Sequence, residues 1–281
     1  MAALRVGRKS LGRRYSARTK AALKAASDLP DRPSPNEIHD LRVAARRIQM
    51  MRRLMPRSER FSQQGKRYDF ALRSVLKATS QLRDMDTLMD TLKSHKGSLP
   101  NELLVRLENQ RSDAAARAKQ AIGVLAEASP PELDISTVRR RRLSKRLRKR
   151  VRKHSRTASE LLTEVLKDES KVKELHSLRK EVKKVRYLVE LADEAPARLS
   201  SLVKWQEALG AIHDLDVAVS YLEVSGFHSR HRAILELQRA RHSNYLKFVR
   251  DRRTELFRAL GDGGAIPVDA LDPSDSTHAV V

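Results

Sequence analysis

The sequence predicts an all-α protein made of two four-helix bundles of the up-and-down type. Glycine and proline number only ten each among the 281 residues, and no segment shows the alternation that is typical of a β-strand. These few residues cluster, and they divide the chain into long helical segments. A motif that begins at His39 also returns at His176, and repetition at this spacing indicates two copies of one unit.

The first half, residues 1–128, contains four predicted helices. The first is strongly basic and ends at the prolines between positions 30 and 35, where Ser34 or Asn36 can cap the next helix. This second helix carries the motif and ends at about Met55, where a proline follows. We expect a third helix over about 62–92, a turn at 97–100, and a fourth helix that ends near residue 127.

A linker over residues 129–135 begins with Ser129-Pro130-Pro131. The second half, residues 136–260, then repeats the order of the first. Its expected helices cover about 136–166, 171–192 and 198–223, with a break at Pro196, a turn at Gly226 and a long last helix to Leu260. Residues 261–281 contain four aspartates and no lysine or arginine, which predicts a disordered acidic tail.

The repeated motif places cations on one face of a helix. Both copies follow the pattern H-x-L-R-x-x-x-(K/R)-(K/R)-(I/V), and positions i, i+3 and i+7 of a helix share a face. An apolar stripe, which includes Leu41 and Ile48, points elsewhere, so we expect the cations to lie off the buried side. The two rows are His39, Arg42 and Arg46 in the first copy and His176, Arg179, Lys183 and Arg186 in the second.

A second element is repeated at an offset of 130 residues. Leu-Arg-Asp-Met-Asp at 82–86 corresponds to Ile-His-Asp-Leu-Asp at 212–216, and the same offset pairs Arg111 with Arg241. The four aspartates could hold a divalent metal or could orient arginine and histidine. Adjacent helix residues point about 100° apart, and a catalytic metal site needs several converging ligands. We therefore favour the second interpretation for Asp84, Asp86, Asp214 and Asp216, and expect no metal and no cofactor.

Composition identifies the class of partner. The 58 lysines and arginines exceed the 35 acidic residues by 23, and such an excess raises self-repulsion unless a polyanion is bound. Nucleic acid, inorganic polyphosphate and an anionic membrane surface all fit. Aromatic residues make up only 4%, and we expect Trp205 and Tyr187 in the core, which disfavours base stacking. The lack of cysteine excludes thiolate metal sites and fits a reducing cytosol, and no apolar run could span a bilayer.

Two segments are especially basic. The N-terminal segment has the composition of a transit peptide, but it lacks a signal-peptide core, so we favour a first helix of the fold. Residues 139–153 hold 11 cations, with Leu143, Leu147 and Val151 spaced four apart. We expect this amphipathic helix to help line the anion groove, with Lys149 as a ligand. Nonspecific nucleic-acid contact and a solvated face are the alternatives.

The two motif copies and the following (R/H)-D-x-D segments resemble the CHAD family, the conserved histidine α-helical domain. The resemblance covers about residues 4–260. Gln49 stands where the second copy has Arg186, a departure that makes the two halves unequal in charge. It implies two four-helix bundles related by pseudo-two-fold symmetry, with a basic central cavity. It also implies binding of inorganic polyphosphate and association with polyphosphate granules in prokaryotes.

The chemistry of the residues agrees with that implication. Polyphosphate has no base to recognise, so a site needs only spaced cations, and arginine offers a fork that matches phosphate oxygens. His39 and His176 could donate a hydrogen bond to the chain, or could instead bond a neighbouring helix. We predict direct phosphate contacts from Arg42, Arg46, Arg47, Arg179, Lys183, Lys184 and Arg186, with Arg83, Arg111 and Arg241 as secondary candidates.

The sequence thus predicts a non-catalytic cytoplasmic protein that binds inorganic polyphosphate in a central basic groove and associates with polyphosphate granules. Two other classes remain as alternatives. The first is an RNA- or DNA-binding protein, in which nucleic acid would displace polyphosphate at comparable charge. The second is a metal-dependent phosphohydrolase, which would release phosphate in the presence of magnesium or manganese.

Overall fold

The computed structural model describes residues 4–94, 100–132, 138–193 and 195–260, with the backbone alone from 251 to 258. Its secondary structure is entirely helical, which confirms the predicted fold class, and none of the described helices is long and apolar enough to cross a membrane. The helices are α1 (Arg8–Ser27), α2 (Pro35–Arg52), α3 (Arg57–Phe61), α4 (Gln63–Ser94), α5 (Asn101–Ala126), α6 (Arg140–Val165), α7 (Val172–Val189), α8 (Pro196–Val224) and α9 (Arg232–Leu260).

The predicted helix starts have local causes in the sequence. Ser34 caps α2, because its Oγ accepts a hydrogen bond from the Glu37 amide at 3.3 Å while the Glu37 carboxylate accepts one from the Ser34 amide at 2.7 Å. Pro196 occupies the first turn of α8, where its missing N–H costs nothing. After α8 the chain turns at Gly226, whose φ of +94° is open to glycine at no steric cost.

The third predicted helix differs from the structure at its start. A short helix, α3, precedes α4, and Ser62 separates the two with an extended backbone conformation. The Ser62 hydroxyl accepts a hydrogen bond from the Gly65 amide at 3.1 Å, so a serine cap starts α4 one residue later than expected. The turn expected at 97–100, most of the linker and the acidic tail lie outside the described residues.

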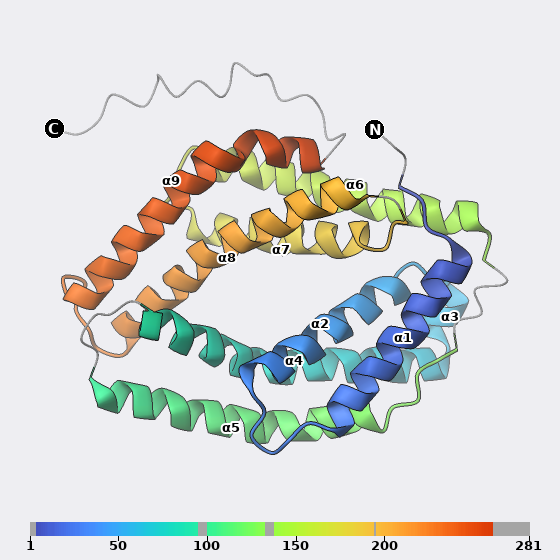
Figure 1. Cartoon of the computed structure of the whole chain (residues 1–281), viewed down its shortest axis with the longest axis horizontal. Coiled ribbons are helices and arrows are strands. Elements are labelled where there is room, and N and C mark those ends of the chain that lie inside the picture. The colour runs from blue at the N-terminus through green and yellow to red at the C-terminus, as the bar shows by residue number, and fades with distance from the viewer. Residues whose placement is uncertain (1–3, 95–99, 133–137, 194, 261–281) are drawn as a thin grey trace.

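The hydrophobic core crosses the proposed boundary between the halves. In Figure 1, α1 to α5 form one layer of helices and α6 to α9 form the other. The largest cluster of buried apolar side chains draws on both layers and includes Trp205 and Tyr187, as predicted. A second cluster joins α4 and α5 to α8 and α9 through residues such as Leu88, Leu107 and Leu222. The division into halves at 129–135 stays a prediction.

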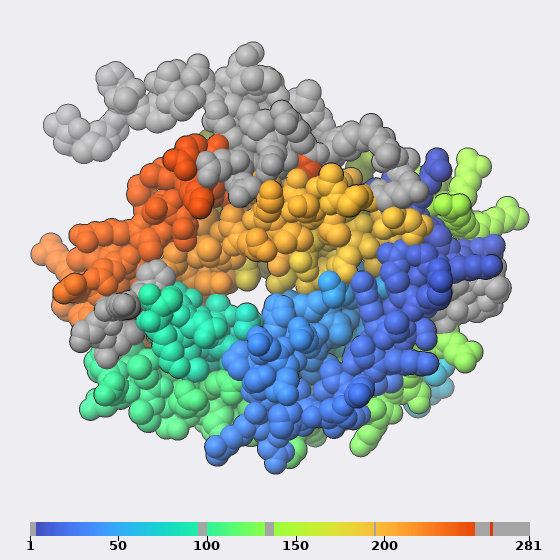
Figure 2. Space-filling view, viewed as in Figure 1, coloured from blue at the N-terminus to red at the C-terminus, as the bar shows by residue number. Residues whose placement is uncertain are grey.

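The two layers meet around an opening. Helix α4 packs on α8, and α2 packs on α7. Figure 2 shows the opening in the middle of the face, between α2 and α4 on one side and α8 on the other. Because α2 and α7 carry the two copies of the motif, their packing brings both copies to the same place.

Candidate anion-binding site

Five cations from the two layers come close to one another where the layers meet. Arg42 and Arg46 come from α2, Arg83 from α4, and Arg179 and Lys183 from α7. Their charges act on one another across the layers. Arg46 and Arg42 lower the pKa of Lys183, and Arg46 and Arg83 lower the pKa of Arg179, in addition to the effect of burial. We call these five residues the groove cluster. Arg186 follows Lys183 on the same face of α7, and its guanidinium lies over the Tyr187 ring, 4.6 Å from the centroid.

Lys183 shows how strongly positive the groove is. Burial lowers the pKa of its ammonium group to about 7, and the neighbouring charges of Arg46, Arg179, Arg186 and Arg42 act in the same direction. An anion in the groove would counteract the effect of the neighbouring cations on this pKa, because it favours the protonated amine. The groove cluster therefore holds cations together at an electrostatic cost.

Two aspartates of the element that is repeated at 82–86 and 212–216 also lie near the groove cluster. Burial raises the pKa of Asp84, against the opposing charges of Arg42, Arg179 and Arg46. The pKa of Asp214 is raised in the same way, and its Oδ1 lies 4.0 Å from Nη2 of Arg179. Each aspartate thus lies near arginines, in line with the favoured interpretation. Two carboxylates against five cations leave the groove positive.

Arg42 departs from the predicted arrangement. We expect it off the buried stripe, but only 6% of the residue is exposed, because α2 packs against α4 on this side. Its Nη1 donates to the Leu76 carbonyl at 2.8 Å and to the Thr79 hydroxyl at 2.7 Å. Burial, followed by the charge of Arg46, lowers its pKa to about 10. Arg42 therefore joins α2 to α4 in addition to adding charge to the groove.

The two motif histidines have different neighbours. Nδ1 of His176 lies 3.0 Å from Nδ1 of His213 on α8, so the alternative of a histidine bonded to a neighbouring helix holds for this copy. In the first copy, His39 lies near Arg83, the residue that corresponds to His213. Burial lowers the pKa of all three histidines, that of His213 to about 3. They are thus hydrogen-bonding groups rather than cations at neutral pH.

Sequence analysis missed His213. The repeat contained a signal for this residue, because His213 occupies in the second (R/H)-D-x-D segment the position that Arg83, a candidate ligand, occupies in the first. Only the packing of α7 on α8 shows that His213 meets His176.

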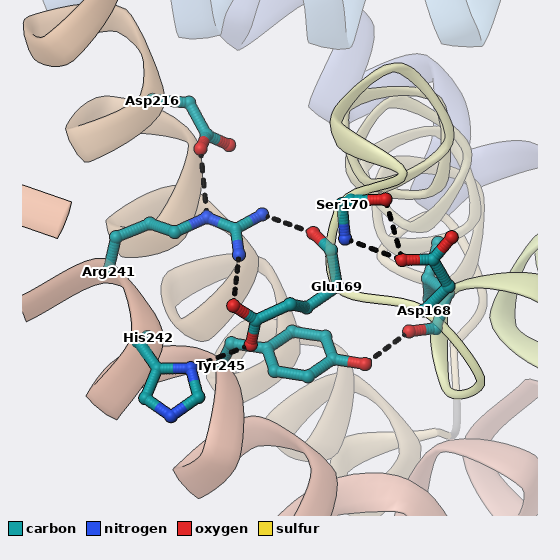
Figure 3. Close-up of polar contacts among 8 residues, drawn as sticks. Asp168, Glu169, Ser170, Asp216, Arg241, His242 and Tyr245 are labelled. Carbon is teal, nitrogen blue, oxygen red and sulfur yellow. Dashed lines mark hydrogen bonds and ion pairs between the residues drawn. The ribbon is translucent and has the colours of Figure 1, made fainter. Parts of the chain in front are cut away.

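Arg111 and Arg241 have the same role in the two halves, and it is structural. Nε of Arg111 donates to Asp86 at 2.6 Å, and its Nη2 donates to the Pro33 carbonyl at 2.7 Å, just before α2. Nε of Arg241 donates to Asp216 at 2.9 Å, and its Nη2 donates to the Glu169 carbonyl at 2.6 Å, just before α7 (Figure 3). Each arginine fixes the start of a motif helix, and neither joins the groove cluster.

Three other predicted ligands also lie outside the groove cluster. Arg47 pairs with Glu190 at 2.8 Å, which links α2 to the end of α7. Lys184 pairs with Glu181 at 2.5 Å, and the same carboxylate contacts His154 of α6. Lys149 is exposed on α6, whose main packing partners are α7 and α9. The basic helix is thus an outer helix and not a wall of the groove.

The described residues contain no group of three or more histidines, aspartates or glutamates that could hold a metal ion. Two of the four repeat aspartates, Asp86 and Asp216, are instead paired with Arg111 and Arg241. The groove therefore offers cations and hydrogen-bond donors to an anionic ligand.

Comparison with known proteins agrees with this architecture. The model of the CHAD domain family matches residues 13–223. A crystal structure of the CHAD domain from the plant Ricinus communis superposes with a TM-score of 0.53 over 92% of this chain and 93% of that chain, at 17% sequence identity. No curated protein matches the chain. The match to the family model spans the motif helices and the groove cluster, and the chain belongs to the CHAD domain family.

Proposed function

We propose that this protein binds inorganic polyphosphate, without catalysis, in the groove between its two layers of helices. The observation that carries the proposal is the groove cluster, in which five cations from α2, α4 and α7 lie close together where the layers meet, and the described carboxylates that act on them, Asp84 and Asp214, are fewer than the cations. A flexible polyanion would neutralise both rows at once, and arginine forks suit phosphate oxygens. Recruitment to polyphosphate granules would follow from the same contact.

The groove suits a chain of phosphates better than a nucleic acid. Proteins that bind single strands stack the bases on aromatic side chains. Tyr187, the ring beside Arg186, is only 3% exposed and Trp205 is fully buried, while the exposed rings of Phe61 and Phe70 are not part of the groove cluster. A hydrolytic role would need converging metal ligands, whereas Asp84 and Asp214 lie among arginines. Binding is therefore the function that these residues support best.

Polyphosphate affinity should fall steeply with salt. Each neutralised charge contributes a slope of about −0.7 in log affinity against log salt for single strands, so five groove cations give about −3.5. A fourfold rise in salt should then weaken binding about a hundredfold. Titration of labelled polyphosphate at several ionic strengths measures this slope. An affinity that does not change with salt, or that single-stranded DNA of equal charge matches, would contradict the proposal. Phosphate release with magnesium or manganese would instead indicate hydrolysis.

Binding should also weaken as the pH rises from about 6 to 9. The pKa of Lys183 is about 7, lowered by burial and by Arg46, Arg179, Arg186 and Arg42. Bound phosphate raises that pKa, so the complex takes up a proton and loses affinity as Lys183 becomes neutral. Burial lowers the pKa of the histidines below its ordinary value, so they add little charge at pH 7 and above.

The matched control for the pH effect is Lys183→Arg, which keeps its charge up to high pH. Its affinity should stay nearly constant over the same range, and calorimetry in two buffers should show proton uptake by the parent protein alone. Identical pH profiles for the parent and this variant would show that Lys183 does not contact the ligand.

A further inference from the structure

A second group of arginines, which form no ion pair with a described carboxylate, lies where α2 ends against α6. Nη1 of Arg146 donates to the Leu54 carbonyl at 2.9 Å, so α6 sits against the end of α2. Arg150 lies one turn further along α6, and Arg53 directly precedes Leu54. Arg60 on α3 lies over the exposed ring of Phe61, 5.4 Å from its centroid. We call Arg53, Arg60, Arg146 and Arg150 the arginine corner.

The four guanidinium groups of the arginine corner repel one another without acidic partners. Burial and the charge of Arg60 lower the pKa of Arg53. Burial lowers the pKa of Arg150, as do the charges of Arg60, Arg53 and Arg146. The acid beside Arg53 is Asp69, and both of its oxygens are bonded by Arg52, at 2.5 and 3.2 Å. Among the described residues, no carboxylate forms an ion pair with any of the four.

The junction of α1 with the end of α7 is built in the same way, but it is neutralised. Nη1 of Arg14 donates to the Glu190 carbonyl at 3.1 Å, as Arg146 does to the Leu54 carbonyl. There, Arg14 pairs with Asp193 at 2.7 Å, and Arg18 pairs with Glu190 at 2.7 Å. The offset of 137 residues between the motif copies places Glu190 where the first copy has Arg53. One junction thus contains its own anions, and the other has an arginine instead.

We propose that the arginine corner is a second phosphate-binding site, which takes the stretch of polyphosphate that leaves the groove; this rests on the proposed function. Arg46, Gln49 and Arg53 share a face of α2, and seven residues of helix span about 10.5 Å. That face leads from the groove cluster to the arginine corner. The equivalent face of α7 ends at Glu190, which is already paired with Arg18 and Arg47. A long chain is therefore guided along α2.

The test replaces Arg53 with glutamate, which supplies the arginine corner with the acid that Glu190 provides at the other junction. Thermal stability of Arg53→Glu should hold or rise, because Arg146 and Arg150 gain a partner. Affinity for long-chain polyphosphate should fall at least tenfold. Affinity for tripolyphosphate, which is too short to reach both sites, should change little. The control Arg106→Glu makes the same charge change at an exposed position on α5.

The outcomes separate the two proposals. If the parent binds neither long-chain polyphosphate nor tripolyphosphate, the proposed function fails, and the second site fails with it. If the parent binds both and Arg53→Glu behaves like Arg106→Glu, the groove stands and the second site is overturned. Should Arg53→Glu melt at a lower temperature, the double variant Arg53→Gln/Arg150→Gln replaces it. The same selective loss of long-chain affinity in that variant would support the site, and unchanged affinity would overturn it.

Discussion

Replacing Arg46, Arg179 and Lys183 by alanine in one variant should abolish tight polyphosphate binding and leave the helical fold intact. These three members of the groove cluster come from both motif copies and are half-buried. A hydrogen bond to a charged group contributes about 1.5 kcal/mol, so three contribute about 4.5 kcal/mol, or on the order of a thousandfold in affinity. Thermal stability without ligand should hold or rise, because the substitutions relieve repulsion.

Arg42 is left in place in this variant because it is buried and bonded to Leu76 and Thr79. Circular dichroism melting and polyphosphate titration measure the two effects side by side. A control with Arg106, Arg117 and Lys149 replaced removes three exposed cations outside the groove cluster. Changing Arg46 alone should weaken binding without erasing it, since the row on α7 remains. A triple groove variant that binds like this control would show that the groove is not the site.

Replacing Arg111 or Arg241 with glutamine should destabilise the protein instead of acting on binding directly. The two side chains are only 13% and 11% exposed, and each pairs with an aspartate, fully buried Asp86 or half-buried Asp216, and with the carbonyl before a motif helix. Removing one partner of such a pair costs about 3 kcal/mol. For a chain of this size the melting temperature should fall by about 5 °C.

The control for these clamps is Arg232→Gln on α9, where an arginine that is 87% exposed pairs with Glu236 one turn away. That variant should melt like the parent, because an exposed pair contributes little. Below the melting transition, Arg111→Gln and Arg241→Gln should keep the polyphosphate affinity of the parent. If these variants lost affinity at an unchanged melting temperature, Arg111 and Arg241 would be phosphate ligands, the role for which the sequence makes them secondary candidates.

Much of this protein could be predicted from local patterns in its sequence. The repeat of the His39 segment at His176 and the scarcity of glycine and proline together indicate the helical fold and the family. Helix starts were predictable where a cap lies within a few residues of the helix, as at Ser34. Caps and repeats are patterns of the sequence itself, so they can be recognised without knowledge of tertiary contacts.

Packing between helices decided which cations face the groove. Helical periodicity puts Arg42 and Arg46 on one face, but it does not say that α4 covers Arg42 and leaves Arg46 half-buried. Arg53 and Glu190 hold equivalent places in the two motif copies, and their surroundings differ because the arginines beside them come from α6 and α1, respectively. The sequence by itself determined the helices, the repeat and the total charge. Only the tertiary structure decided which charges are paired and which stay free, because ion pairs join residues that are distant in the chain.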